Sequence, residues 1–228
     1  MDYVIPLWQT SSVVVSKATK RFPVHRIYCV GRNYAEHAKE MGGDPEREPP
    51  FFFCKPADAV VTSGSAIPYP LATKNFHHEV ELVVALNSGG TRIKPEAALD
   101  AVFGYAVGVD LTRRDLQQAM RDKGRPWDVG KAFDRAAPTG ALHTVAEVGH
   151  LASAKIALKV NDVTKQQGDV KDMVWNVAEI ISHLSGLFEL QAGDLIFTGT
   201  PAGVGPLQVG DRVDASIAGL SPLKFSIA

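Results

Sequence analysis

The chain has 228 residues, of which 45% are hydrophobic and 21% charged, and its formal net charge is −1. These values are typical of a globular protein with one domain, and the near-neutral charge excludes the basic surface with which proteins bind nucleic acids or anionic membranes. No apolar run approaches the roughly 20 residues of a membrane span, and the N-terminus lacks the basic start of a signal peptide, so we expect a cytoplasmic protein.

The sequence predicts an N-terminal arm over residues 1–21 and one continuous domain over residues 22–228. Within the domain, short runs rich in β-branched and aromatic residues, each bounded by Gly, Pro or Asn, predict strands. The predicted strands are Arg26–Gly31, Glu81–Leu86, Val102–Asp110, Lys155–Asn161, Asp194–Gly199 and Asp211–Ala218. Cys29 and Cys54 lie in such apolar runs, and we expect both to be unpaired and to pack as small hydrophobic residues.

Helical patterns are fewer than strands. They predict helices over Asn33–Gly42, over Thr112–Gly124 with Thr112 as N-cap, and over Met173–Gly186. Because the strands do not alternate regularly with helices, we expect an α+β fold built mainly of mixed β-sheet and exclude a doubly wound nucleotide-binding sheet. The stretch "GTPAGVGP" lacks the features of a phosphate-binding glycine loop.

Two carboxylates interrupt the strand pattern in "NFHHEVELVVAL", which otherwise alternates as a half-buried strand does. Glu79 and Glu81 are two residues apart and point to the same side of a strand, where they repel each other unless a cation lies between them. Carboxylate oxygens without sulfur suit Mg²⁺, Mn²⁺ or Ca²⁺, and such an ion needs a further anionic ligand. A solvated strand end is the alternative that this pair alone leaves open.

Asp110 is the candidate for the third ligand. It ends the apolar run "VFGYAVGV", where a charged group requires a partner. Its position alone also fits an N-cap for the helix that follows.

Two further segments carry candidate catalytic groups. His37 and Glu40 are three residues apart, hence on one face of a helix, and a histidine oriented by a carboxylate can take a proton from water. The alternative is a solvated helix with a weak ion pair. Lys131 lies between apolar residues near Trp127, where it can stabilise a developing enolate or extend along the aromatic surface toward solvent.

Taken in order, these segments resemble the fumarylacetoacetate hydrolase family from about Arg26 to Val213. The motifs that carry the resemblance are "YCVGRNYAEHAKEMG", "FFFCKPADAVV", "HHEVELVVAL", "GYAVGVDLTRRDLQ", "KGRPWDVGKAFD" and "GDLIFTGTPAGVGPLQVGD". The resemblance implies the β-rich mixed-sheet fold of that family and, usually, a homodimer.

The same resemblance implies roles for individual residues. Glu79, Glu81 and Asp110 match the ligands of Mg²⁺ or Mn²⁺, with Ca²⁺ a weaker candidate. His37 and Glu40 match a water-activating dyad on a mobile lid, and Lys131 matches the active-site lysine. Positions that line the substrate site in the family correspond to Arg32, Asn33, Arg114, Gln117 and Thr200.

The segment "DPEREPPFFFCKP" resembles the fumarylpyruvate hydrolase branch, which serves gentisate degradation. The expected reaction is hydrolysis of a C–C bond in a 2,4-dioxo acid, fumarylpyruvate, to fumarate and pyruvate. Acylpyruvase, oxaloacetate decarboxylase and the isomerase/decarboxylase of homoprotocatechuate degradation are alternatives. A non-catalytic metal-binding relative is another, although a structural site would not need His37, Glu40 and Lys131.

Overall fold

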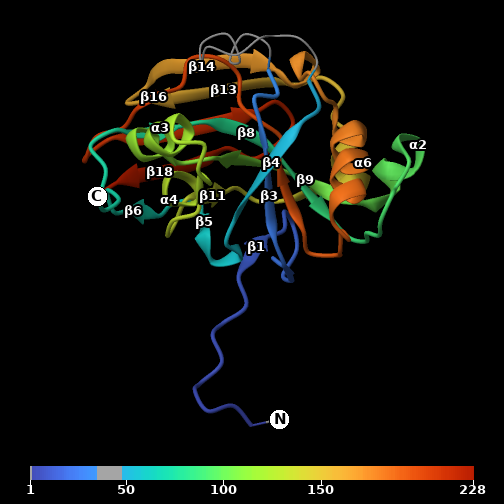
Figure 1. Ribbon diagram of the computed structural model, residues 1–228. Coiled ribbons are helices and arrows are strands. Elements are labelled where there is room, and N and C mark those ends of the chain that lie inside the picture. Colours follow the sequence, from blue (N-terminus) through green and yellow to red (C-terminus); the bar gives the residue numbers. More distant parts are fainter. Residues whose placement is uncertain (1, 35–47) are drawn as a thin grey trace.

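The computed structural model describes residues 2–34 and 48–228, and its centre is a mixed sheet of eight strands (Figure 1). Seven strands lie side by side, and the eighth, β12, pairs with β9 outside this path. In spatial order they are β4 (Phe51–Lys55), β3 (Ile27–Gly31), β15 (Leu195–Phe197), β8 (Val80–Leu86), β9 (Val102–Val109), β11 (Ala137–Thr139) and β5 (Val60–Thr62), with β12 at His143–Thr144.

The other strands form three smaller sheets. A five-stranded sheet contains β14 (Val163–Asp169), β13 (Lys155–Val160), β17 (Arg212–Ile217), β18 (Leu223–Ile227) and β6 (Ala66–Ile67). A three-stranded sheet contains β10 (Thr112–Arg113), β7 (Phe76–His78) and β16 (Gly205–Pro206), and a two-stranded sheet contains β1 (Ser12–Val14) and β2 (Arg21–Pro23). The α+β, β-rich fold expected from the sequence is confirmed.

Strand β8 differs from the half-buried strand that its alternation predicts. All seven of its residues are buried, because the five-stranded sheet packs against β8 and β9, and the apolar side of helix α6 (Val177–Leu187) joins the same core. Burial of both faces explains why Val83 and Ala85 are apolar as well as Val84. The two acids at the start of this segment therefore lie at an entrance to the core and not on a solvated surface.

The helices among the described residues are short and lie at the edges of the sheets (Figure 1). They are α2 (Pro95–Ala98), α3 (Arg114–Asp122), α4 (Asp128–Lys131), α5 (Val145–Val148) and α6, with 3₁₀ turns η1 (Ala57–Ala59), η2 (Leu99–Ala101) and η3 (Val170–Asp172). None of these helices is long and apolar enough to cross a membrane.

Two helix predictions need correction. Helix α3 begins at Arg114 and not at Thr112, because Thr112 pairs with His77 in the three-stranded sheet and its hydroxyl donates to the Asp110 carbonyl. Helix α6 begins after Asn176, whose side chain accepts from the Glu179 N–H while Glu179 accepts from the Asn176 N–H, a capping box that the apolar spacing alone did not show.

The predicted strands are all present, with bounds shifted by one or two residues at one or both ends. Both cysteines are free, as expected; Cys29 is buried, but Cys54, on the edge strand β4, is exposed and does not pack as a buried hydrophobic residue. At the N-terminus, residues 2–8 extend away from the body (Figure 1), whereas Ser11 accepts from the Val24 N–H and Val13 and Val15 pack into the core. The predicted division into an arm over residues 1–21 and a domain over residues 22–228 stays a prediction.

Candidate active site

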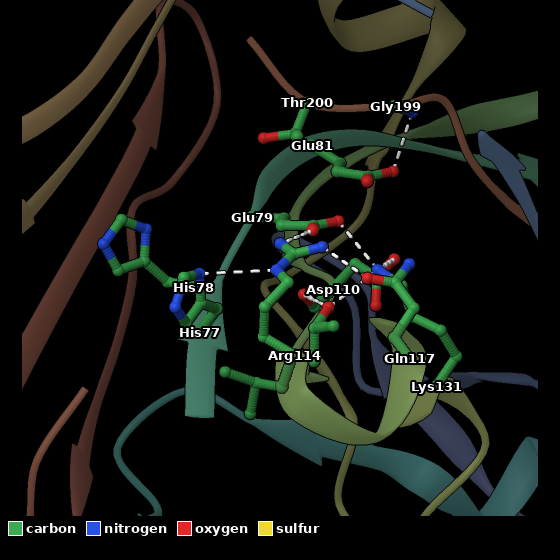
Figure 2. Close-up of polar contacts among 12 residues, drawn as sticks. His77, His78, Glu79, Glu81, Asp110, Arg114, Gln117, Lys131, Gly199 and Thr200 are labelled. Atoms are coloured by element: carbon green, nitrogen blue, oxygen red, sulfur yellow. Dashed lines mark hydrogen bonds and ion pairs between the residues drawn. The ribbon is translucent and has the colours of Figure 1, made fainter. Parts of the chain in front are cut away.

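The acidic residues meet where two central strands come together. Glu79 lies between β7 and β8, Glu81 is the second residue of β8, and Asp110 follows β9 directly. Because β8 and β9 are antiparallel, with Val80 opposite Val109, Glu79 and Asp110 lie at the same end, and the Asp110 N–H donates to the Glu79 carbonyl at 2.8 Å. One carboxylate oxygen from each of the three acids lies within 4.8 Å of the others (Figure 2).

Three basic side chains compensate these acids. Lys131 Nζ contacts Glu79 Oε2 at 2.8 Å and Asp110 Oδ2 at 2.7 Å, and Arg114 Nη2 donates to Glu79 Oε1. Behind the cluster, Lys55 Nζ lies 2.8 Å from Asp110 Oδ1 and donates to the Lys131 carbonyl at 2.5 Å. Buried charges persist only when they are paired in this way.

Glu81 is the acid with the weakest compensation. Its Oε2 accepts from the Gly199 N–H at 2.7 Å, and no cationic side chain among the described residues makes a salt bridge with it. Burial, then the charges of Asp110 and Glu79, raise its pKa well above the ordinary range. A cation at this point would remove that cost.

The geometry decides between the alternatives that the sequence left open for these acids. Glu79 is 5% and Glu81 2% exposed, which excludes a solvated strand end. Asp110 does not cap a helix, because α3 begins four residues later and its N-cap is Arg113. All three carboxylates instead face one another.

Lys131 ends helix α4 and is 2% exposed, so the alternative in which it extends toward solvent is wrong. Its ammonium also donates to Thr112 Oγ1 at 2.7 Å. Burial lowers the pKa of Lys131, but the charges of Asp110 and Glu79 outweigh burial and the pKa is raised. Lys131 is therefore a charged hydrogen-bond donor and not a base.

A cavity of about 30 Å³ opens beside the acidic cluster. Of the predicted substrate residues, Arg32, Arg114, Gln117 and Thr200 line it. The remaining lining residues are Val30, Gly31, Phe51, Phe53, Glu79, Glu81, Asp110, Gln118, Arg121, Trp127 and Lys131. Charged groups thus lie at both ends of a cavity that has an aromatic wall.

Asn33 is not among the residues that line this cavity. Its side-chain amide donates to the carbonyls of Trp175 and Thr198 and accepts from the Trp175 N–H. Asn33 thus fixes the segment after β3 against the entry to α6. Its predicted contact with substrate stays a prediction.

Thr200 is held by a residue that the sequence did not indicate. Gln166 Nε2 donates to Thr200 Oγ1 at 2.8 Å, while Gln166 Oε1 accepts from the Val80 N–H and contacts His78 Nδ1. Gln166 is 1% exposed and lies on β14, far along the chain, so local spacing carried no signal for it.

Lys55 is the second residue that sequence analysis missed. It lies in "FFFCKP", where it ends a strand and carries no local sign of a buried partner. The predicted dyad, His37 and Glu40, and its lid lie outside the described residues, and so do their contacts.

The residues present fit a divalent metal ion. The three clustered carboxylates offer only hard oxygen ligands, which suit Mg²⁺ or Mn²⁺, and the raised pKa of Glu81 marks a negative charge that protein cations do not fully compensate. Three protein ligands leave further positions of an octahedral ion for water or substrate.

Comparison with known proteins gives consistent matches. The family model for the C-terminal region of fumarylacetoacetate hydrolase matches residues 26–228. The crystal structure of fumarylpyruvate hydrolase from Pseudomonas aeruginosa in complex with Mn²⁺ and pyruvate matches with a TM-score of 0.98 and 51% identity, covering 100% of this chain and 99% of that one.

Two curated relatives have different activities. A fumarylpyruvate hydrolase from a Ralstonia species is 41% identical over 184 residues, which are 81% of this chain and 95% of that protein. A mitochondrial oxaloacetate tautomerase from Mus musculus is 40% identical over 201 residues, which are 88% and 90% of the two chains.

Proposed function

The chain belongs to the fumarylacetoacetate hydrolase family, and from this premise we propose that it is a metal-dependent hydrolase that cleaves fumarylpyruvate to fumarate and pyruvate. The observation that carries the proposal is the buried cluster of Glu79, Glu81 and Asp110 with Lys131 at the base of the cavity. The proposed metal is Mg²⁺ or Mn²⁺, and relatives named for fumarylpyruvate hydrolysis support the substrate.

The charge of the site supports an anionic substrate. Lys55, Lys131 and Arg114 bring three positive charges beside the three acids before any ion binds, although their salt bridges are to Glu79 and Asp110 and not to Glu81. A divalent ion would therefore leave an excess of positive charge in a buried site, and carboxylates of the substrate would balance it. A 2,4-dioxo acid with a second carboxylate meets this requirement better than a neutral ketone.

When bound, the ion acts as a Lewis acid that polarises the 2-oxo acid end of the substrate. Lys131, held charged by Asp110 and Glu79, would exchange one of its three hydrogen bonds, to Glu79, Asp110 and Thr112, for one to the oxygen on which negative charge develops. Thr200 and Gln117 offer polar groups along the cavity wall that orient the substrate.

We propose that His37, oriented by Glu40, takes a proton from water. The resulting hydroxide adds to the 4-carbonyl carbon, the bond between carbons 3 and 4 breaks, and its electron pair passes to the 2-oxo acid part as an enolate. Protonation of that enolate gives pyruvate, and the other fragment is fumarate. One water is consumed, His37 returns its proton to the enolate, and the proton of the newly formed carboxylic acid passes to solvent, so that atoms and charge balance.

Relatives named oxaloacetate tautomerase favour a second candidate, because that reaction also forms an enolate next to a 2-oxo acid but needs no attacking water. Turnover of fumarylpyruvate, acetylpyruvate and oxaloacetate, each with Mg²⁺ and with chelator, separates the two. Fumarate and pyruvate in equal amounts support the hydrolase; turnover of oxaloacetate alone would replace it with the second candidate. A homodimer, a cytoplasmic location and a role in gentisate degradation remain parts of the proposal.

A further inference from the structure

We infer that Arg32 and Arg121 form an anion site at the mouth of the cavity, which binds the terminal carboxylate of a substrate whose 2-oxo acid end lies at the acidic cluster. This inference rests on the proposed function and deepens it, because it assigns the residues that select the far end of the substrate. A flat, unsaturated chain with a carboxylate at its end is the class of tail that fits.

Helix α3 supplies a polar stripe along one wall. Arg114, Gln117, Gln118 and Arg121 all line the cavity, and their spacings of three and four residues place them on one face of the helix. Seven residues of α-helix rise about 10 Å. Arg121 therefore stands about 10 Å along the wall from Arg114, a span suited to an extended acyl chain.

Arg114 is not available for the tail. Its guanidinium donates to Glu79 through Nη2, to Gln117 Oε1 through Nη1 at 2.5 Å, and to His77 Nδ1 through Nε at 3.4 Å. His77 Nδ1 accepts the bond from Arg114, while its Nε2 contacts Asn75 Oδ1 at 2.7 Å. The inner arginine thus belongs to the floor of the site.

Arg32 lies at the mouth with its guanidinium carbon 5.8 Å from the centroid of the Phe51 ring. It follows β3 with a backbone φ of 57°, a conformation rare outside glycine, which sets the direction of its side chain. Burial, and then the positive charge of Arg121, lower the pKa of Arg32, while Glu48 opposes them. Both guanidiniums line the cavity, and their planar sets of N–H donors match the two oxygens of a carboxylate.

An aromatic wall joins the floor to this mouth. The ring centroid of Phe53 lies 5.2 Å from Lys131 Nζ, and Trp127 packs against Phe53 at 5.9 Å and against the Phe51 ring at 5.2 Å, edge to face. The wall therefore begins at Lys131 and ends beneath Arg32. Flat aromatic faces pack well against a planar conjugated chain.

Steady-state kinetics on two substrates with the same 2,4-dioxo acid end test the site. Fumarylpyruvate carries the terminal carboxylate, and acetylpyruvate has a methyl group instead. We expect Arg121→Gln and Arg32→Gln each to lower the ratio of their kcat/KM values about 10- to 100-fold, through KM of fumarylpyruvate. Arg125→Gln, an exposed residue just beyond α3, is the matched control and should keep the ratio.

A loss of the same size on both substrates, or an equal change with Arg125→Gln, would overturn the site. Calorimetric titration of the Mg²⁺-loaded protein with fumarate and with oxalate separates binding from reaction. Arg121→Gln should raise the Kd of fumarate at least about tenfold more than that of oxalate. If the wild type hydrolyses neither substrate, but Arg121→Gln still raises the Kd of fumarate more than that of oxalate, the proposed reaction is wrong and the anion site stands. If it hydrolyses both but the two Kd values change equally, the reaction stands and the anion site is wrong.

Discussion

Helix α3 lines both the floor and the mouth of the cavity, but the two regions differ in burial and in charge. At the floor, Arg114 and Gln117 are buried and bonded to each other beside the acidic cluster. At the mouth, Gln118 is exposed and Arg121 partly exposed. At the floor, Lys131 is buried between Glu79 and Asp110, whereas at the mouth two partly exposed arginines line the same opening.

This difference separates reaction from selection. A buried, paired group cannot change without affecting its partners, so substitutions at the floor should reduce turnover of every substrate. The mouth contacts only the tail of the substrate, so substitutions there should change the preference among substrates. Substitutions at the floor and at the mouth test this division.

Glu81→Ala should have the largest effect. Two carboxylates hold a hard cation poorly, so we expect Mg²⁺ binding to be lost and turnover of all substrates to fall to that of chelator-treated wild type. Calorimetric metal titration and kinetics measure this. Glu96→Ala, an exposed acid on α2, is the matched control. Full activity of the wild type after chelator treatment would show that the reaction at the floor does not depend on a metal ion.

Lys131→Met should lower kcat for fumarylpyruvate and acetylpyruvate alike, by about 10²–10³-fold, because a donor to developing charge is removed. In the metal-free variant, Glu79 and Asp110 face each other with no ammonium between them. Removal of one partner of a buried ion pair typically lowers the free energy of unfolding by about 3–5 kcal/mol. The melting temperature of the metal-free variant should therefore fall.

Added Mg²⁺ should recover more of that melting temperature in Lys131→Met than it adds to the wild type. Exposed Lys123, changed to Met, is the control for loss of a surface lysine. Equal Mg²⁺ responses in both proteins would mean that Lys131 and the ion do not share the two carboxylates.

His37→Ala should keep metal binding but lower hydrolysis at least about a hundredfold, the usual scale for removal of a general base. Turnover of oxaloacetate, which requires no attacking water, should fall less. Product analysis on both substrates measures the difference. Hydrolysis at the wild-type rate would remove His37 from the proposed mechanism.

The sequence predicted the floor far better than the mouth. Glu79, Glu81 and Asp110 stand out because charged residues interrupt apolar strands, and the mutual geometry of antiparallel β8 and β9 then brings them together. Lys55 could not be found in this way, because a strand-end lysine has no local mark of burial and its partner Asp110 is distant in the sequence. Gln166 was missed for the same reason.

The fold shows the same limit. Strand positions followed from local composition, but the pairing of β3 with β15, and of β10 with β7, depends on contacts across the whole chain. The second of these pairings removed Thr112 from the predicted helix. At the mouth, the aromatic wall combines β4 with Trp127, and nothing in either segment alone indicates that they meet.

Gly31→Ala should have the smallest effect on the reaction and test whether the wall supports the mouth. An added Cβ would lie 1.9 Å from the Phe51 ring, so the ring must move from beneath Arg32. Overpacking of this kind costs about 1–3 kcal/mol of stability. We expect the preference for fumarylpyruvate over acetylpyruvate to fall by more than either kcat, as measured by kinetics beside thermal unfolding.

Gly186→Ala is the matched control, because this exposed glycine near the end of α6 has no atom within 4 Å of an added Cβ. It should raise stability by about 0.5–1 kcal/mol and leave the preference unchanged. If Gly31→Ala also leaves stability and preference unchanged, Phe51 does not hold the mouth in place. If instead Gly31→Ala lowers kcat equally for both substrates, the aromatic wall supports the reacting groups at the floor. The boundary between residues that affect the reaction and residues that affect substrate preference then lies elsewhere along α3.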